Sequence, residues 1–247
     1  MRVEQIGPAT LYCGDCFDVL PEIRSVDAVL TDMPYGCTAC AWDKTPDLAA
    51  FWRLALPAAK ENAAFCLCAD MRFAVALVNS QPRLFRYDIV WRKSVPVGFL
   101  NAKRAPLRAH ELVLVFYRRL PAFHPQKTAG KPYRALHRVF SSNYGTQRPT
   151  MTCSDGSRYP LSVLDIPSES RGAHPTQKPV ALMEWLVKSY SAPGELVLDP
   201  FMGAGSTGVA AVASGARFVG VEMAPEYFDH ACRRIEQAVR AAEGAQP

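Results

Sequence analysis

The sequence lacks the apolar runs that membrane insertion or secretion requires. No stretch approaches the roughly eighteen uncharged apolar residues of a spanning helix, and the N-terminal "MRVEQIGPAT" has no apolar core of a secretory signal. We therefore expect no membrane partner and a cytoplasmic location. In that compartment the eight cysteines are mostly reduced thiols rather than a disulfide framework.

An ATPase phosphate loop is also missing, because no G-x-x-x-x-G-K-[ST] motif occurs, and no internal repeat is visible. Apolar residues make up 49% of the 247 residues and charged residues 21%, which is ordinary for a protein with a full core. This length is enough for one large α/β domain or two small ones.

Acidic residues are scarce in the middle of the chain. From Arg92 to Arg148 there are twelve Lys and Arg against one acid, Glu111, a net charge of +11. The remainder holds 16 basic and 22 acidic residues and carries −6. A basic block mixed with aromatic residues predicts a nucleic-acid partner, although a solvated loop with a chance bias is the alternative. The cations that we expect to contact phosphates are Lys93, Lys103, Arg104, Arg108, Arg118, Arg119, Lys127, Lys131, Arg134 and Arg138.

Three regions follow one another along the chain. In residues 1–119, apolar strand-like runs alternate with helix-like stretches, which predicts a mostly parallel sheet covered on both faces. Residues 120–171 are rich in proline and show little periodicity, so they predict an irregular insertion. Residues 172–247 return to the α/β pattern. The expected strands are 26–32, 63–70, 86–93, 111–119, 195–201 and 217–223, and the expected helices are 47–62, 179–191, 203–215 and 225–244.

A glycine-rich turn follows the strand-like "LVLDPF". Gly203, Gly205 and Gly208 match G-x-G-x-x-G between a predicted strand and a predicted helix. The next strand ends in Glu222, whose carboxylate can accept hydrogen bonds from ribose hydroxyls. The pattern predicts a nucleoside cofactor and leaves nicotinamide and S-adenosylmethionine both open; a tight turn without a ligand is the alternative.

The stretch "VLTDMPYG" places Asp32, Pro34 and Tyr35 just past the carboxyl end of a buried strand, where parallel sheets bind ligands. A carboxylate there can accept a hydrogen bond from an exocyclic amino group, and an adjacent backbone carbonyl can accept a second. Pro34 stiffens the turn, and Tyr35 offers a flat face for an extruded base. A proline turn without chemistry is the alternative.

Four motifs in this order, "DMPY", "HPTQKP", "DPFMGAGSTG" and "VGVE", resemble the β group of amino-methylating DNA methyltransferases. The resemblance covers most of the chain. It implies an α/β fold with a circularly rearranged, Rossmann-like, seven-strand methyltransferase sheet and an irregular target-recognition insertion. Residues 1–119 would form the catalytic half, 120–171 the target-recognition insertion and 172–247 the cofactor-binding half.

The same resemblance implies roles for individual residues. Asp32, Pro34 and Tyr35 match the catalytic motif, with Met33 in place of the family's first proline, and "WRK" and "HE" match positions near the base pocket less specifically. The residues expected to bind S-adenosylmethionine are Asp15, Cys16, Asp32, Thr176, Lys178, Asp199, Phe201, Gly203, Gly205 and Glu222.

The implied activity is site-specific methylation of the N6 amino group of adenine in duplex DNA, with base flipping, because an initial Asp in the motif goes with adenine. N4 of cytosine is the first alternative, followed by a non-enzymatic DNA-binding protein and a nicotinamide-dependent dehydrogenase. A cognate restriction endonuclease and a homodimer stay open as partners. No cysteine has the Pro-Cys setting of cytosine-C5 enzymes.

Two C-x-x-C pairs, Cys13 with Cys16 and Cys37 with Cys40, have a spacing compatible with a zinc site. They flank the strand that leads to Asp32, and Cys16 runs into a helix-like stretch rather than a knuckle loop. We therefore expect no metal and assign the chemistry to Asp32.

Overall fold

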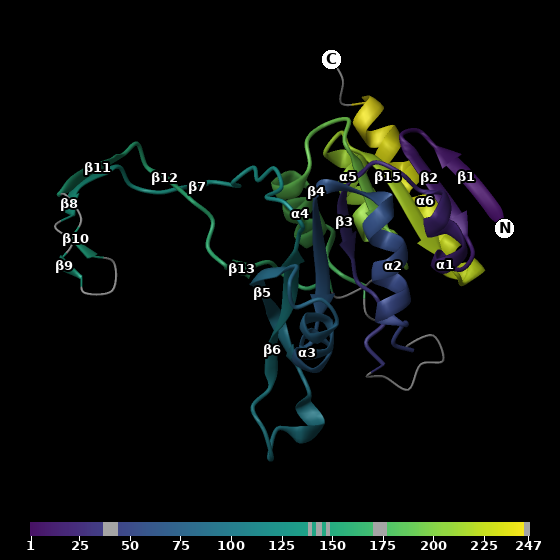
Figure 1. Cartoon of the computed structure of the whole chain (residues 1–247), viewed down its shortest axis with the longest axis horizontal. Helices are drawn as coiled ribbons and strands as arrows, with labels where there is room; N and C mark the ends of the chain where they lie inside the picture. The colour runs from purple at the N-terminus through teal and green to yellow at the C-terminus, as the bar shows by residue number, and fades with distance from the viewer. Residues whose placement is uncertain (37–43, 138–139, 142–144, 147–148, 170–176, 245–247) are drawn as a thin grey trace. The chain divides into compact units, whose positions relative to one another are not determined.

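One large sheet holds the strands that lead to Asp32, Asp199 and Glu222 (Figure 1). The computed structural model describes residues 1–36, 44–137, 140–141, 145–146, 149–169 and 177–244. Within these ranges the sheet has nine strands in the order β1-β2-β15-β14-β3-β4-β6-β5-β13. Their bounds are β1 Arg2–Ile6, β2 Ala9–Cys13, β3 Val26–Thr31, β4 Ala59–Ala69, β5 Phe85–Val97, β6 Arg108–Phe116, β13 Val163–Asp165, β14 Leu196–Asp199 and β15 Arg217–Glu222.

The pairing confirms the predicted fold class. Strands β2, β15, β14, β3 and β4 are parallel, and β6 runs antiparallel between β4 and β5. Seven strands lie between the edge strands β1 and β13, and the late strands β14 and β15 insert beside the early strand β3. This is the circularly rearranged, Rossmann-like arrangement that the family resemblance implies.

Helices cover both faces of the sheet. Buried side chains of α4 (Val180–Tyr190), α5 (Ser206–Ala213) and α6 (Pro225–Gly244) belong to the apolar core on one face. The core on the other face includes α1 (Cys16–Val19), η1 (Leu20–Glu22), α2 (Leu48–Ala58) and α3 (Met71–Ser80). The helical period explains this burial, since Leu182 with Leu186 and Phe228 with Ile235 recur at spacings of four and seven.

Strand β4 shows why the central strands read as continuous apolar runs. Its side chains alternate, so that Cys66 and Cys68 enter one core while Phe65 and Leu67 enter the other. All four are buried, which makes the two cysteines core residues. Burial raises the pKa of the Cys66 thiol, which keeps it protonated and inert.

Some element boundaries differ from the prediction. The helix expected over 47–62 ends at Ala58, and β4 begins at Ala59 directly after it. Pro57 lies in the last turn of α2 and donates no hydrogen bond to the turn before it, and the helix ends one residue later. Helix α3 and the β1–β2 hairpin were not predicted; Asp70 starts α3 by accepting a hydrogen bond from Phe73 N at 2.9 Å.

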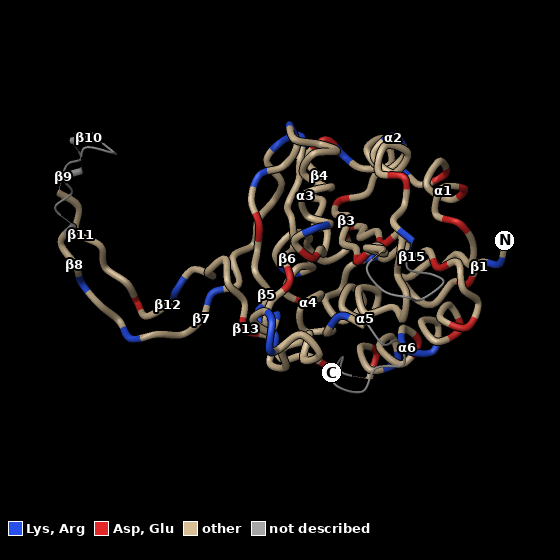
Figure 2. Tube along the Cα trace, turned by 90° about the horizontal axis from the view of Figure 1, so that it is seen from below, with Lys and Arg blue, Asp and Glu red and all other residues tan. Residues whose placement is uncertain are grey.

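Residues Pro125–Leu161 form a second unit, separate from the unit of Met1–His124 and Ser162–Pro247. Its strands are β7 Thr128–Ala129, β8 Tyr133–His137, β9 Phe140–Ser141, β10 Gly145–Thr146, β11 Thr150–Ser154 and β12 Ser157–Arg158. They pair antiparallel as β7 with β12, β8 with β11 and β9 with β10, so the unit is a two-stranded ribbon. Figure 2 shows Lys and Arg along it.

In the ranges that the structure describes, no helix is both long enough and apolar enough to cross a membrane.

Candidate active site

The polar residues predicted from the sequence meet at one edge of the sheet. Because β3, β14 and β15 are parallel, Asp32, Asp199 and Glu222 come at the same ends of adjacent strands. A cavity of about 970 Å³ opens at this edge and is lined by all three side chains. Its size lies in the range of roughly 300–1,000 Å³ of small-molecule sites.

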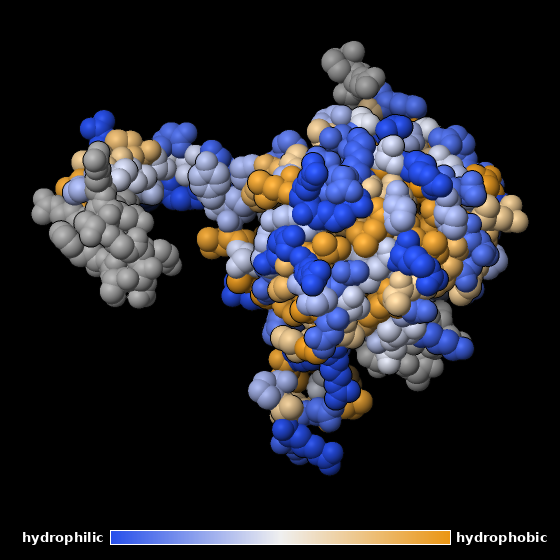
Figure 3. All heavy atoms as spheres, viewed as in Figure 1, coloured by the Kyte–Doolittle hydropathy of each residue, from blue (hydrophilic) through white to orange (hydrophobic). Residues whose placement is uncertain are grey.

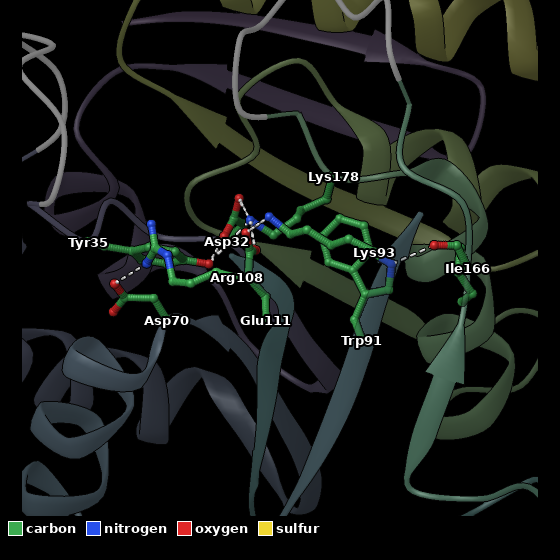
Figure 4. A network of polar contacts seen from close by, with 9 residues as sticks. All are labelled: Asp32, Tyr35, Asp70, Trp91, Lys93, Arg108, Glu111, Ile166 and Lys178. Atoms are coloured by element: carbon green, nitrogen blue, oxygen red, sulfur yellow. Dashed lines mark hydrogen bonds and ion pairs between the residues drawn. The ribbon is translucent and has the colours of Figure 1, made fainter. Parts of the chain in front are cut away.

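The turn after β3 forms an elbow that presents Asp32 and Tyr35 together (Figure 4). The Tyr35 hydroxyl donates to Asp32 Oδ1 at 2.5 Å, and the Tyr35 ring stacks on Phe73 at 5.2 Å with an interplanar angle of 28°. Burial, and then the neighbouring Asp32 charge, raise the pKa of Tyr35 well above that of an ordinary tyrosine, so its hydroxyl stays a donor. Pro34 lines the same cavity.

Lys178 joins this elbow from a segment 146 residues further along the chain. Its ammonium lies 2.7 Å from Asp32 Oδ2, 3.1 Å from Glu111 Oε2 and 3.2 Å from the Tyr35 hydroxyl (Figure 4). Only 7% of the Lys178 side chain is exposed. Burial alone lowers the pKa of Lys178, but the carboxylates of Asp32 and Glu111 outweigh it and raise the pKa above the usual lysine value. Lys178 is therefore a permanent cation.

Glu111 is held by two cations. Lys93, two residues past Trp91, the partner of Glu111 on the neighbouring strand β5, makes a second ion pair with this carboxylate. Burial raises the pKa of Glu111, but the charges of Lys178 and Lys93 outweigh burial and hold the pKa below its usual value. The side chains of Asp32, Lys178, Glu111 and Lys93 thus form a row of alternating negative and positive charges. Lys93, predicted to contact phosphate, lines the cavity rather than an open surface.

The remaining wall of the cavity comes from β5, β6 and the start of α3. Trp91 donates from Nε1 to the carbonyl of Ile166 at 2.8 Å, and Lys93 Nζ lies 5.2 Å from the centre of the Trp91 ring. Arg108 reaches Asp70 at 3.4 Å near the rim. These contacts fix a flat aromatic plate opposite the elbow.

At the other end of the cavity, the glycine turn needs its glycines. Gly203 and Gly205 have φ of +52° and +79°, in the left-handed region that side chains disfavour. A Cβ at Gly205 would lie 2.9 Å from the Cβ of Ala231, whereas one at Gly203 would meet nothing within 4 Å. Gly203 therefore presents bare backbone to the cavity, and Phe201 lines the cavity beside it.

Glu222 closes this turn from the neighbouring strand. Its Oε2 accepts from Gly203 N at 3.0 Å and its Oε1 accepts from Ala224 N at 2.7 Å. Burial raises the pKa of Glu222 against these two hydrogen bonds. Each carboxylate oxygen has a further lone pair that can face the cavity.

Asp15 and Cys16 begin α1 on the far side of Glu222. The Asp15 carboxylate caps the helix by accepting from Phe17 N at 2.9 Å, and Gly14 N donates to the Glu222 carbonyl at 3.0 Å. Burial, and then the Asp15 charge, raise the pKa of the Cys16 thiol to about 12. Both residues line the cavity beside Glu222. The Asp15 carboxylate is engaged in the helix cap, and the Cys16 thiol stays protonated.

Asp199 holds the strand ends together. Both of its oxygens accept hydrogen bonds at 2.6 Å, one from the Thr31 hydroxyl and the other from the Thr207 hydroxyl, and Phe201 N donates at 3.1 Å. Burial raises the pKa of Asp199 to about 7 despite these bonds. The sequence predicts Asp199 as a cofactor residue; its contacts show that it links β3, β14 and α5.

This raised pKa gives a testable pH dependence. Between the ordinary value of 3.8 and about 7, folded Asp199 binds a proton that the unfolded chain does not. The stability that this bound proton contributes is complete below pH 3.8 and is lost as the pH rises through about 7. We expect Asn at position 199 to remove that loss, so the urea midpoint of Asp199→Asn should fall less than that of the wild type from about pH 5 to about pH 8.

Asp165→Asn is the matched control, because Asp165 is exposed and its pKa is lowered by Arg92, which places its titration below this window. An Asp199→Asn protein with the pH slope of the wild type would contradict the assignment.

The predicted phosphate contacts are distributed over three places. Lys103, Arg104 and Arg108 lie in the β5–β6 hairpin, at the edge where the cavity opens. Arg118 and Arg119 follow the other end of β6, where Arg118 pairs with Glu61. Exposed cations of the ribbon unit are Lys127, Lys131 and Arg134.

Some predicted residues lie outside the described ranges, namely Thr176, Arg138, Cys37 and Cys40. Within the described part, Cys13 and Cys16 are free thiols, and no group of three or more His, Cys, Asp and Glu is placed to hold a metal.

Phe73, which packs against the Tyr35 ring, was not predicted. Glu111 was predicted only as part of "HE" near the base pocket; its ion pairs with Lys178 and Lys93 were not. Asp70, an acid at the end of an apolar strand, could have signalled the helix that carries Phe73. Nothing in the local pattern of Glu111 links it to Lys178, 67 positions away.

Comparison with known proteins points to one family. The family model N6_N4_Mtase, described as DNA methylase, matches residues 26–233. The chain is 48% identical over 65 residues to the DNA adenine methyltransferase YhdJ of Escherichia coli (strain K12), and 43% identical over 70 residues to the putative methylase YubD of that organism. These matches cover 26% and 28% of this chain but only 22% and 31% of the relatives' own lengths.

Solved structures match over nearly the whole chain. The M1.HpyAVI–SAM complex has a TM-score of 0.66 at 26% identity and covers 92% of this chain and 99% of the other. The PvuII DNA methyltransferase, described as cytosine-N4-specific, has a TM-score of 0.69 at 15% identity, with 98% and 95% coverage. At this lower identity the likeness to PvuII shows the fold alone.

Proposed function

This chain belongs to the DNA methylase family that its sequence matches from residue 26 to residue 233, and on that premise we propose that it transfers a methyl group from S-adenosylmethionine to the N6 amino group of adenine in duplex DNA. One observation carries the proposal. The Asp32–Tyr35 elbow and the Gly203–Glu222 turn line a single cavity, so a donor held at one end can meet an amino group held at the other.

The residues present fit the cofactor. Gly203 offers backbone with open space before it, and Glu222 offers a carboxylate to ribose hydroxyls. Asp15 and Cys16 border this end of the cavity, and Phe201 adds apolar surface. S-adenosylmethionine supplies, when bound, a methyl group on a positively charged sulfur.

The elbow suits the acceptor. Asp32 and a backbone carbonyl beside it can each accept a hydrogen from an amino group, which turns the nitrogen lone pair out of conjugation with the base. The Tyr35 ring provides a stacking face, worth roughly 1–3 kcal/mol for an extruded base. Met33 in place of proline leaves the carbonyl available.

Electrostatics favour the same step. The amine nitrogen becomes positive as it gains the methyl group, and its extra proton then leaves to water. In the structure the Asp32 carboxylate already holds a nitrogen cation, the Lys178 ammonium, at 2.7 Å and close to the Tyr35 ring. A carboxylate at this point would stabilise the transition state in the same way.

Adenine is favoured over cytosine by the Asp that begins the elbow motif and by the similarity to a protein named as a DNA adenine methyltransferase. To test this, the protein is expressed in cells that lack their own DNA methylation, and genomic DNA is sequenced for modified bases. We expect N6-methyladenine at one short sequence. N4-methylcytosine would reassign the base, and unmodified DNA from cells containing folded protein would refute the proposal.

The cofactor site gives a second test. Changing Glu222 to Gln should weaken S-adenosylmethionine binding about tenfold or more, since hydrogen bonds to charged groups contribute roughly 1.5–3 kcal/mol each. Titration calorimetry measures the affinity. Glu226→Gln, four residues on and exposed, should bind as the wild type does. Equal affinities for both variants would remove Glu222 from the cofactor site.

The cognate restriction endonuclease, the homodimer and the cytoplasmic location remain predictions. Light scattering of the purified chain tests the homodimer directly.

A further inference from the structure

The β5–β6 hairpin carries apolar side chains out into solvent. Val97 pairs with Arg108 at its last rung, and residues 98–107 form the hairpin tip beyond it. Figure 3 shows orange apolar side chains and blue polar ones mixed on this projection. The exposed large apolar residues of the hairpin are Val95, Val97, Phe99, Leu100 and Leu107.

The hairpin tip is a built turn. Gly98 has a φ of +92°, which a residue with a side chain rarely adopts, and it starts the short helix η2 (Phe99–Asn101). Backbone hydrogen bonds from Asn101 N to Gly98 O at 2.9 Å and from Arg104 N to Asn101 O at 2.8 Å hold it. This turn leaves Phe99 77% exposed and Leu100 85% exposed, side by side at the end of the hairpin.

The charge around these two side chains is positive. Lys103, Arg104 and Arg108 are all exposed, and the sequence has no Asp or Glu between Asp88 and Glu111. Grouped apolar side chains on a surface mark a contact with another molecule. The cations around these apolar side chains indicate that the other molecule is a polyanion.

The hairpin also borders the catalytic cavity. Val95, Val97 and Arg108 line the cavity together with Asp32 and Tyr35. Whatever molecule brings a base to Asp32 therefore passes the hairpin. The apolar tip of the hairpin therefore lies next to the cavity that would receive the base.

We propose that Phe99 and Leu100 form a wedge that enters the base stack of duplex DNA beside the extruded target base. The inference rests on the proposed function. Extrusion of a base costs unstacking and unpairing, and an inserted apolar side chain recovers part of the lost stacking. The cations next to the wedge hold the phosphates on either side of the gap.

The test compares two synthetic duplexes that contain the methylated sequence found in the wild type. In one the target base is paired, and in the other it faces an abasic site. For the double variant Phe99→Ala/Leu100→Ala, we expect kcat/KM on the paired duplex to fall roughly tenfold, the factor that corresponds to about 1.4 kcal/mol. On the abasic duplex, where little pairing opposes extrusion, the variant should match the wild type within about twofold.

Leu120→Ala is the matched control. Leu120 is 78% exposed and follows the opposite end of β6, so its removal should leave both rates unchanged. An equal loss on both duplexes would show a general DNA contact and overturn the wedge, and so would unchanged rates on both. If the wild type methylates neither duplex, the proposed function itself fails, and the wedge fails with it.

A second copy of this chain is the competing occupant. If the hairpin tip were a dimer contact, the double variant would lower the molar mass of the free protein in light scattering. That result, together with equal rate losses on both duplexes, would assign the patch to self-association and overturn the wedge.

Discussion

Asp32→Asn should lower the methyl transfer rate by roughly 10²–10³-fold or more, the range seen when a group that stabilises transition-state charge is removed. Asn keeps the shape of the side chain but loses the negative charge and one acceptor oxygen. The amino group of the base then has a weaker orienting partner, and the developing nitrogen cation has no opposite charge beside it. Single-turnover transfer of labelled methyl to a duplex with the identified site measures this step.

The same variant should still bind S-adenosylmethionine, because Gly203 and Glu222 lie at the other end of the cavity. Asp165→Asn is the control for the loss of one acid. Asp165 is exposed and paired with Arg92 at the sheet edge, where water screens the ion pair. Near wild-type transfer by Asp32→Asn would show that this carboxylate does not act on the base.

Lys178→Met should destabilise the folded protein by about 3–5 kcal/mol, the usual cost of removing one partner from a buried ion pair. Lys178 lies between Asp32 and Glu111, and its loss leaves two carboxylates facing the space that the ammonium filled. Urea unfolding followed by circular dichroism measures the change. Lys93 still pairs with Glu111, so the unbalanced charge is mainly that of Asp32.

Two further variants separate charge from packing. Lys178→Met/Asp32→Asn removes the unbalanced carboxylate as well and should recover part of the loss, by a coupling of about 0.5–3 kcal/mol. Lys188→Met breaks the exposed pair with Glu184 on α4 and should cost about 0.3–0.5 kcal/mol. A loss as small for Lys178→Met as for Lys188→Met would contradict the buried network.

Much of the site was predictable because strand ends leave local signals. The runs before Asp32, Asp199 and Glu222 are apolar and end in acids, so a parallel sheet brings them to one edge without further information. The glycine turn was also predictable from a local signal. Gly203 and Gly205 follow an apolar strand, and a tight strand-to-helix turn is where such a pair of glycines is required. The family resemblance then identified the chemistry.

The charge network was not predictable, because it depends on side chains that meet through the sheet order. Lys178 directly precedes α4, so it reaches Asp32 and Glu111 only because α4 packs against β3 and because β6 lies two strands from β3 in the sheet. The sequence predicts Lys178 as a cofactor residue, and nothing in the sequence pattern indicates its contacts with Asp32, Tyr35 and Glu111. Helix α3 was missed because its start depends on one capping acid, Asp70, that also ends a strand.

The place of β14 in the sheet has a consequence for biosynthesis. Its Leu198 pairs with Val29 of β3, and Asp199 bonds to Thr31 across 168 residues of sequence. Such distant partners close a large loop and fold slowly compared with local ones. A nascent chain that has left the ribosome only as far as the ribbon unit still lacks β14, the neighbour of β3 in the middle of the sheet. Both ends of the cavity therefore form together, late in synthesis.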